Sequence, residues 1–137
     1  MTENLWGQLP ALYKEASGAD TNVTIMCQRF NELKDNPDYI FVAAATDSGE
    51  LVGFMSGIVN HDIVEQGMPF LTIWNIRTKG IYRRRGIGKT MMAYLENEAK
   101  KLGCDFIALI SGNNRPESHE FYKALHFEEM KGFVKHI

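Results

Sequence analysis

The sequence predicts a mixed α/β fold in which helices flank a central sheet. Three observations carry this prediction. Residues 71–76 are β-branched, aromatic and apolar, which is typical of a buried strand. Apolar residues recur at three to four positions from Ile87 to Leu102, the period of one helix face. Asp47-Ser48-Gly49 lies between two apolar stretches, as the turn of a β-hairpin does.

The N-terminal part is expected to be helical, at about residues 4–16 and 22–34. Thr21 or Asn22 provides the N-cap of the second stretch, and Pro37 ends it because proline cannot continue the hydrogen-bond ladder. Residues 39–46 and 50–59 then form the two strands of the hairpin. The apolar face of the second helical stretch consists of Val23, Met26, Cys27, Phe30 and Leu33.

The C-terminal half alternates strands and helices. A polar loop at residues 60–69 leads to a strand at 70–78, and a helix at 86–102 stops at Gly103. The expected remaining elements are a strand at 105–110, a loop at 111–115, a helix at 116–124 and a last strand at 128–136. This order predicts one sheet with helices packed against it.

Size and charge restrict the class of protein. The 137 residues, 45% of them apolar, are expected to form a single domain over 1–137 with its own core. A net charge of −2 argues against nucleic acid or an anionic membrane as partner. No apolar run approaches the ~20 residues that cross a bilayer.

The cysteines indicate the compartment. Cys27 and Cys104, in a chain without a signal peptide, favour a reducing, cytoplasmic location. Both are expected to be buried as small apolar residues. Neither has a partner at metal-ligand spacing, so no metal is expected.

The segment Tyr82-Arg83-Arg84-Arg85-Gly86-Ile87-Gly88-Lys89 joins a predicted strand to a predicted helix. Its glycines let the backbone approach a ligand without interference from Cβ atoms. The first N–H groups of a helix have no internal partner and lie at the positive end of the helix dipole, so they suit phosphate oxygens. Three arginines add bidentate phosphate donors. The segment predicts a site for a phosphorylated cofactor.

Two other interpretations apply to this segment. Gly88-Lys89-Thr90 resembles the end of a P-loop, but that motif has a glycine where this chain has Arg83. A solvated basic turn at the start of a helix would give a similar pattern, since charge runs are common on surfaces. The segment taken alone does not decide between a phosphate site and a basic turn.

Motifs elsewhere in the chain favour the phosphate site. Arg83-x-x-Gly86-x-Gly88 resembles the acetyl-CoA motif of the GNAT superfamily of N-acetyltransferases, Gln/Arg-x-x-Gly-x-Gly/Ala. Residues 115–127 are similar to its closing signature, Arg-x-x-Ala-His-x-Phe-Tyr-x-x-x-Gly-Phe, and residues 36–54 are similar to its central hairpin. The motifs stand in the family's order. The resemblance implies a central mixed, mostly antiparallel sheet flanked by helices.

The resemblance also implies acetyl transfer from acetyl-CoA to an amine by direct attack, without an acyl-enzyme. The main-chain N–H of Ile76 corresponds to the one that polarises the acetyl carbonyl. Asn113 and Asn114 lie near the family's asparagine that contacts the cofactor arm, and Arg115 is the alternative for its place. The family's pantetheine strand corresponds to Ile76, Arg77 and Thr78, and its pyrophosphate segment to Arg83, Arg84, Arg85, Gly86, Ile87, Gly88 and Lys89.

Tyr122 corresponds to the family tyrosine that protonates or hydrogen-bonds the departing thiolate. Reference pKa values near 10 for tyrosine and 8.5 for a thiol make full proton transfer uphill by only ~2 kcal/mol, which is compatible with this role. Without the resemblance, Phe121-Tyr122 would be taken as an aromatic core pair with an outward hydroxyl.

The general base is harder to assign. An alkyl amine with a pKa near 10.4 is neutral in only about 1 of 2,500 molecules at pH 7, a penalty of ~4.6 kcal/mol, so a base or a water chain to one is expected. Many family members place a glutamate nine residues before the conserved Arg/Gln, and here that position is Trp74. The candidates are His61, Asp62 and Glu65 on the preceding loop, and His119 on the closing helix.

Other positions also depart from the family pattern. Ser118 replaces the usual alanine, and His126 replaces the glycine before Phe127. If that glycine has a positive φ, histidine can adopt it at modest cost. Residues 1–19 show no strand pattern, so the family's first strand is missing, very short or supplied by a partner chain. An exposed sheet edge there would favour a homodimer, because unpaired strand edges recruit partners.

The acceptor is expected to be a primary amine of a small molecule. Trp74 would narrow the acceptor pocket or stack on a cation, and Glu65, with Asp62, would suit a cationic amine. Three alternatives stay open. They are acetylation of protein N-termini or lysines, transfer of a longer acyl group, and an acyl-CoA-binding or sensor domain that has lost its base.

Overall fold

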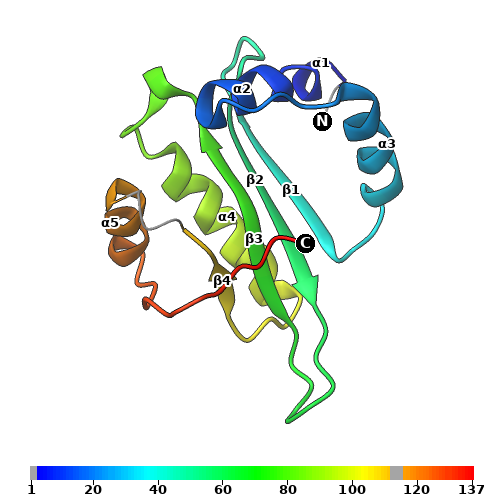
Figure 1. Cartoon of the computed structure of the whole chain (residues 1–137), viewed down its shortest axis with the longest axis vertical. Helices are drawn as coiled ribbons and strands as arrows, with labels where there is room; N and C mark the ends of the chain where they lie inside the picture. The colour runs from blue at the N-terminus through cyan, green and yellow to red at the C-terminus, as the bar shows by residue number, and fades with distance from the viewer. Residues whose placement is uncertain (1–2, 112–115) are drawn as a thin grey trace.

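The computed structural model describes residues 3–111 and 116–137 (Figure 1). Three helices open the chain: α1 (Glu3–Trp6), α2 (Leu9–Ser17) and α3 (Val23–Leu33). Three long strands follow: β1 (Tyr39–Ala45), β2 (Leu51–Asn60) and β3 (Phe70–Thr78). The chain continues through the 3-10 helix η1 (Gly80–Tyr82), α4 (Ile87–Lys101), β4 (Ile107–Leu109) and α5 (Pro116–Ala124).

The strands form one sheet in the order β1-β2-β3-β4. β1 and β3 pair antiparallel with β2, whereas β4 pairs parallel with β3. The predicted mixed, mostly antiparallel sheet is therefore confirmed. The pairing of β4 stops at Ile73, so beyond that residue the described strands pair with β3 on its β2 side alone.

The sheet separates two apolar cores. On one face α4 packs against the three long strands, around the fully buried Met55, Leu71 and Leu95. On the other face, Trp6 of α1 packs with Phe54 of β2. Figure 1 shows α1 and α2 across one end of the strands and α3 on the β1 side of the molecule. The two faces thus have separate packing, and β3 borders both.

Most predicted elements agree with the observed ones to within two residues. The predicted strand at 70–78 and helix at 116–124 coincide with β3 and α5. Asn22 is the N-cap of α3, and its Oδ1 accepts a hydrogen bond of 3.1 Å from the Ile25 N–H. No strand precedes β1 in residues 3–38, so the described chain lacks the family's usual first strand and β1 lies at the sheet edge.

Two of the predicted elements are wrong. The helix expected at 4–16 is two helices, because the chain turns at Gly7 and Gln8 and starts again with Pro10 in the first turn of α2, where proline is favoured. No strand forms at 128–136. Apolar residues there do not alternate with polar ones, so no face can be buried, and Phe133 is 91% exposed.

Cys27 is exposed rather than buried, while Cys104 is half-buried. Burial raises the pKa of the Cys104 thiol. The difference arises because α3, which carries Cys27, contributes no buried residue. In the described part of the chain, no helix combines the length and the apolar character needed to cross a bilayer.

Candidate active site

Carboxylates of α2 and of the turn between β1 and β2 anchor the turn between β3 and α4. Glu50 accepts hydrogen bonds from Lys79 Nζ at 2.7 Å and from the Tyr82 hydroxyl at 3.1 Å. Glu15 of α2 accepts one of 2.6 Å from the Gly80 N–H. The hydrogen bond between Glu50 and Lys79 lowers the pKa of the Glu50 carboxyl and raises the pKa of the Lys79 ammonium group. The turn is therefore fixed by charged groups at neutral pH.

No local sequence pattern signalled these anchors. Glu15 and Gly80 are 65 positions apart, and Glu50 and Lys79 are 29 apart. Only the folded chain brings them together.

Two left-handed residues shape the start of α4. Arg84 has φ 63°, and Gly86, the N-cap of α4, has φ 80°. The left-handed region costs a non-glycine residue ~1–2 kcal/mol, and such strain gathers at functional sites. A Cβ atom on Gly86 would meet nothing within 4 Å. The space beside the Gly86 backbone is therefore open to a ligand.

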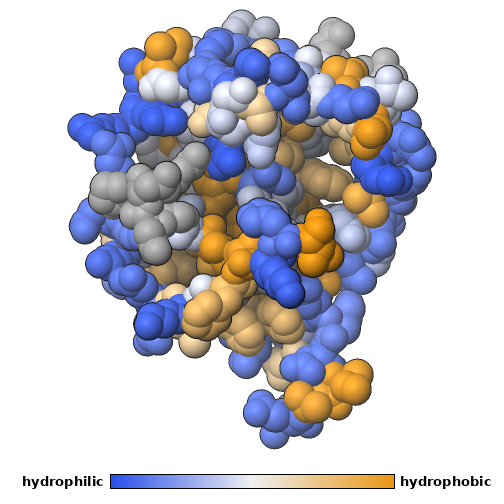
Figure 2. Space-filling view, viewed as in Figure 1, coloured by the Kyte–Doolittle hydropathy of each residue, from blue (hydrophilic) through white to orange (hydrophobic). Residues whose placement is uncertain are grey.

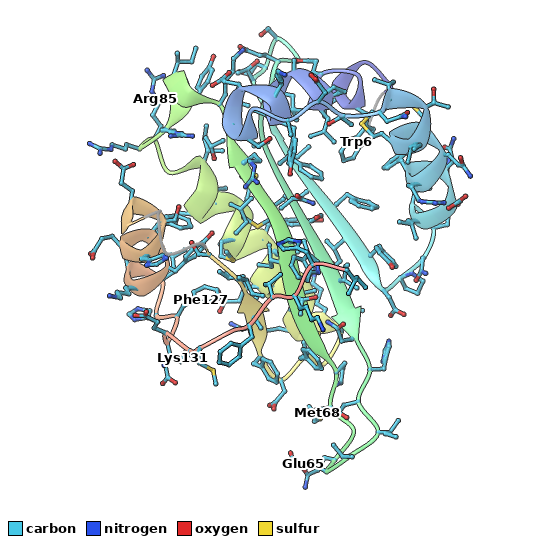
Figure 3. All side chains as sticks on the ribbon, in the orientation of Figure 1. Trp6, Glu65, Met68, Arg85, Phe127 and Lys131 are labelled. Carbon is cyan, nitrogen blue, oxygen red and sulfur yellow. The ribbon has the colours of Figure 1, made fainter. Side chains whose placement is uncertain are left out.

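No side chain caps the N-terminus of α4, and no acidic residue in its first turn balances the positive end of the helix dipole. Gly86 has no side chain to accept from the first-turn N–H groups, and no acidic residue lies in that turn. Arg83, Arg84, Arg85 and Lys89 are exposed, and none forms an ion pair with another described residue. Figure 3 shows Arg85 at this end of the molecule. Open N–H donors and uncompensated cations suit a diphosphate.

The exposed edge of β3 lies next to this helix end. The Lys79 N–H donates to the Val52 carbonyl at 2.8 Å, so Lys79 faces β2. Alternate residues of a strand face opposite neighbours, so Arg77 also faces β2, whereas Ile76 and Thr78 face the side that β4 leaves unpaired. The main-chain N–H of Ile76 is thus on the edge where the resemblance places the acetyl carbonyl. The side chain of Arg77 lies over the Tyr13 ring, 5.1 Å from its centroid.

Trp74 is the extra residue of a β-bulge. Ser56 pairs with Asn75 and Gly57 pairs with Ile73, which leaves Trp74 without a partner on β2. Its side chain is 61% exposed. Bulges often lie beside active sites, where they re-aim side chains. The position of the family's usual glutamate therefore presents an exposed indole, and nothing in the local sequence signalled the bulge.

Helix α5, which carries Tyr122, contacts the start of α4 through Phe121. A Cβ atom on Gly88 would lie 3.2 Å from Cζ of Phe121. The half-buried ring of Tyr122 packs against the α4-side core and edge-on to Phe127, at a centroid distance of 5.8 Å. His126 has φ 68°, so histidine adopts the left-handed conformation at the position of the family glycine.

The base candidates lie in different places. His119 is half-buried and lies on α5, one turn before Tyr122. His61 Nε2 is 2.8 Å from Asp38 Oδ1. Asp62 Oδ1 accepts from the N–H groups of the two residues that follow it. Of the four, His119 is the one on the element that carries Tyr122.

Glu65 does not lie near the start of α4. It lies in the loop between β2 and β3, with φ 52°, at the opposite end of the molecule from Arg85 (Figure 3). Figure 2 shows hydrophobic side chains at this loop, where Ile63 is 97% exposed. Asn114 and Arg115, which the resemblance places near the cofactor arm, lie outside the described residues.

The family profile named acetyltransferase (GNAT) family matches residues 2–127. The chain belongs to the GNAT acetyltransferase family. The resemblance seen in the sequence is therefore confirmed. Membership of the family explains why an open helix N-terminus lies beside an unpaired strand edge in this chain. No curated protein matches the sequence.

Solved structures share the GNAT fold over nearly the whole chain. A transcriptional regulator from Bacillus halodurans is 24% identical with a TM-score of 0.89, and the match covers 100% of this chain and 96% of that one. An aminoglycoside N-acetyltransferase in complex with CoA is 20% identical with a TM-score of 0.84, covering 100% and 90%. Glucosamine-6-phosphate N-acetyltransferase from Arabidopsis thaliana is 14% identical with a TM-score of 0.83, covering 98% and 91%. At these identities the likeness concerns the fold.

Proposed function

We propose that this GNAT protein transfers an acetyl group from acetyl-CoA to a primary amine of a small molecule. The observation that carries the proposal is the open, cationic N-terminus of α4 beside the unpaired edge of β3. The N–H groups from Arg84 to Lys89 would bind the pyrophosphate, with the arginine side chains around it. On the unpaired edge, Thr78 would hydrogen-bond the pantetheine arm, since the Ile76 carbonyl already accepts from Arg77 Nη1 at 2.8 Å.

The chemistry needs one oxyanion donor and one acid. The amine nitrogen attacks the thioester carbonyl, and negative charge develops on the carbonyl oxygen, where the Ile76 N–H would stabilise it. The C–S bond then breaks, and the Tyr122 hydroxyl would donate its proton to the departing thiolate. Tyr122 suits this role because its ring packs against Phe127, and because α5, the helix that carries it, contacts α4.

The amine must lose a proton before or during attack. His119 is the candidate base because it shares α5 with Tyr122, and water reaching it would carry the proton from the amine. The choice of a small-molecule amine is supported by structural neighbours named for aminoglycosides and for glucosamine 6-phosphate.

Trp74 favours a second candidate function, an acyl-CoA-binding domain without turnover, because an exposed indole stands where the family usually has its glutamate. Release of the CoA thiol from acetyl-CoA, followed with a panel of primary amines, separates the two. Amine-dependent release is expected for the acetyltransferase. Binding of acetyl-CoA without release from any amine would favour the second function.

A further inference from the structure

A cavity of about 310 Å³ lies on the face of the sheet opposite α4, between α3 and the strands. This volume is at the lower end of small-molecule sites, which run from about 300 to 1,000 Å³. In Figure 2 the recess between α3 and the strands is floored by apolar side chains. Five aromatic residues line it: Trp6, Tyr13, Phe30, Phe41 and Phe54.

The aromatic rings surround Trp6 at tilted angles. The ring of Trp6 lies 4.8 Å from that of Phe30, 5.7 Å from that of Phe54 and 6.1 Å from that of Phe41, measured between centroids. Figure 3 shows Trp6 under α1 and beside α3. The wall that α3 supplies is apolar yet contributes no fully buried residue. The walls therefore offer ring faces and edges to a flat apolar guest.

The charges of the lining exclude a polycation. No Asp or Glu side chain lines the cavity within the described chain, and its one basic residue, Arg29, is paired with Glu32 at 2.8 Å. A guest with several ammonium groups would find no counter-charge in this lining. A guest with a single amine can keep that amine outside the apolar part.

One polar side chain relates the cavity to the cofactor edge of the sheet. Asn75 lines the cavity from β3, where it stands between Trp74 and Ile76. The cavity thus reaches the strand whose exposed edge is assigned to the acetyl group.

We propose that this cavity binds the acceptor and selects a primary amine on an aromatic body, such as a phenylethylamine. The ring packs against the aromatic lining, and the amine points past Asn75. This assignment of the acceptor class rests on the proposed acetyl transfer.

The test measures binding of the amine alone, in the absence of acetyl-CoA. The chain has two tryptophans, Trp6 and Trp74, so Trp74→Phe leaves Trp6 as the only indole reporter. We expect phenylethylamine to change the Trp6 emission saturably, and kanamycin, a polycation, to leave it unchanged. In the same background, Phe30→Ala is expected to raise the Kd about tenfold, as the loss of one ring contact predicts.

Ile25→Ala is the matched control, because Ile25 lies on the same helix but is half exposed and outside the lining. It should leave the Kd unchanged. Phe30→Leu replaces Phe30→Ala if the alanine variant unfolds at the assay temperature. No saturable response to the arylalkylamine, an equal response to kanamycin, or equal effects of the two α3 variants would each overturn the assignment. Acetylation of kanamycin but not of the arylalkylamine would also overturn it, while leaving the acetyltransferase proposal standing.

Discussion

Gly88 and Phe121 approach so closely that a Cβ atom on Gly88 would lie 3.2 Å from Cζ of Phe121. The contact joins the second residue of α4 to the helix that carries Tyr122. The second glycine of the acetyl-CoA motif therefore has a packing role in this chain, in addition to the open backbone that the motif supplies. It sets how near Tyr122 can come to the start of α4.

Gly88→Ala should lower turnover, because the added methyl group must displace the Phe121 ring and with it α5. Alanine also favours the helix by up to ~1 kcal/mol, so thermal stability alone would not report the displacement. Phe121→Leu in the same chain should restore part of the turnover. A double-mutant cycle on kcat/KM measures this coupling, expected at about 0.5–3 kcal/mol for residues in contact. Additive effects would contradict the packing role.

Gly86→Val should abolish binding of CoA and leave the fold intact. A valine there fills the open space beside the backbone and must adopt φ 80°, at a cost of ~1–2 kcal/mol. Gly103→Val is the matched control, since Gly103 follows the other end of α4, has φ 76° and is equally open. Calorimetric titration should show CoA binding to the Gly103 variant alone. Equal binding to both variants would mean that Gly86 is not part of the site.

Tyr122→Phe should lower kcat by about 10²–10⁴, the usual contribution of a general acid, and leave the Kd of acetyl-CoA unchanged. The phenylalanine ring keeps the packing against Phe121 and Phe127, so the melting temperature should be retained. Steady-state kinetics and calorimetry on the same preparation check both expectations. An unchanged kcat would remove Tyr122 as the acid.

His119→Ala should change the pH profile of kcat/KM more than its maximum. With His119 as base, the wild-type rate should depend less steeply on pH, because the imidazole takes the proton from the bound amine. Without it, the rate should keep rising about tenfold per pH unit towards the pKa of the amine, because solvent must remove the proton. Profiles of the two proteins measured from pH 5 to 9 make the comparison. Superimposable profiles would assign the base elsewhere.

Glu50→Gln should weaken CoA binding by the same factor at pH 6 and pH 8. The lowered pKa of Glu50 means that its contribution is present above its ordinary value of 4.5 and is lost only as pH falls through the lowered value. The raised pKa of Lys79 keeps its contribution up to and beyond 10.5. The pair is therefore charged throughout the neutral range. Calorimetry at both pH values measures the factor, and a marked difference between them would contradict this account of the turn.

The strands and helices next to the site could be predicted from the sequence because local patterns specify them. β3 reads as an apolar strand, and α4 begins after two closely spaced glycines. The family glycine at the position of His126 raised the question of a positive φ there, and the structure shows one. The expected last strand failed because Met130, Phe133 and Val134 do not alternate with polar residues and no neighbouring strand covers them.

The features that the sequence did not disclose depend on distant parts of the chain. The left-handed Arg84 has no local signature, since arginine has no preference for that conformation. Glu50 anchors the turn across the sheet, and the Trp74 bulge arises from the register of β3 on β2. The aromatic cavity needs α3 to stand away from β1, which its apolar face alone does not predict.

The most direct test of the central claim is a calorimetric titration of the wild-type chain with acetyl-CoA, followed by addition of a primary amine in the same cell. The account predicts saturable binding with one site per chain and then amine-dependent release of free CoA thiol. No binding of acetyl-CoA would contradict the claim that the turn between β3 and α4 is a pyrophosphate site.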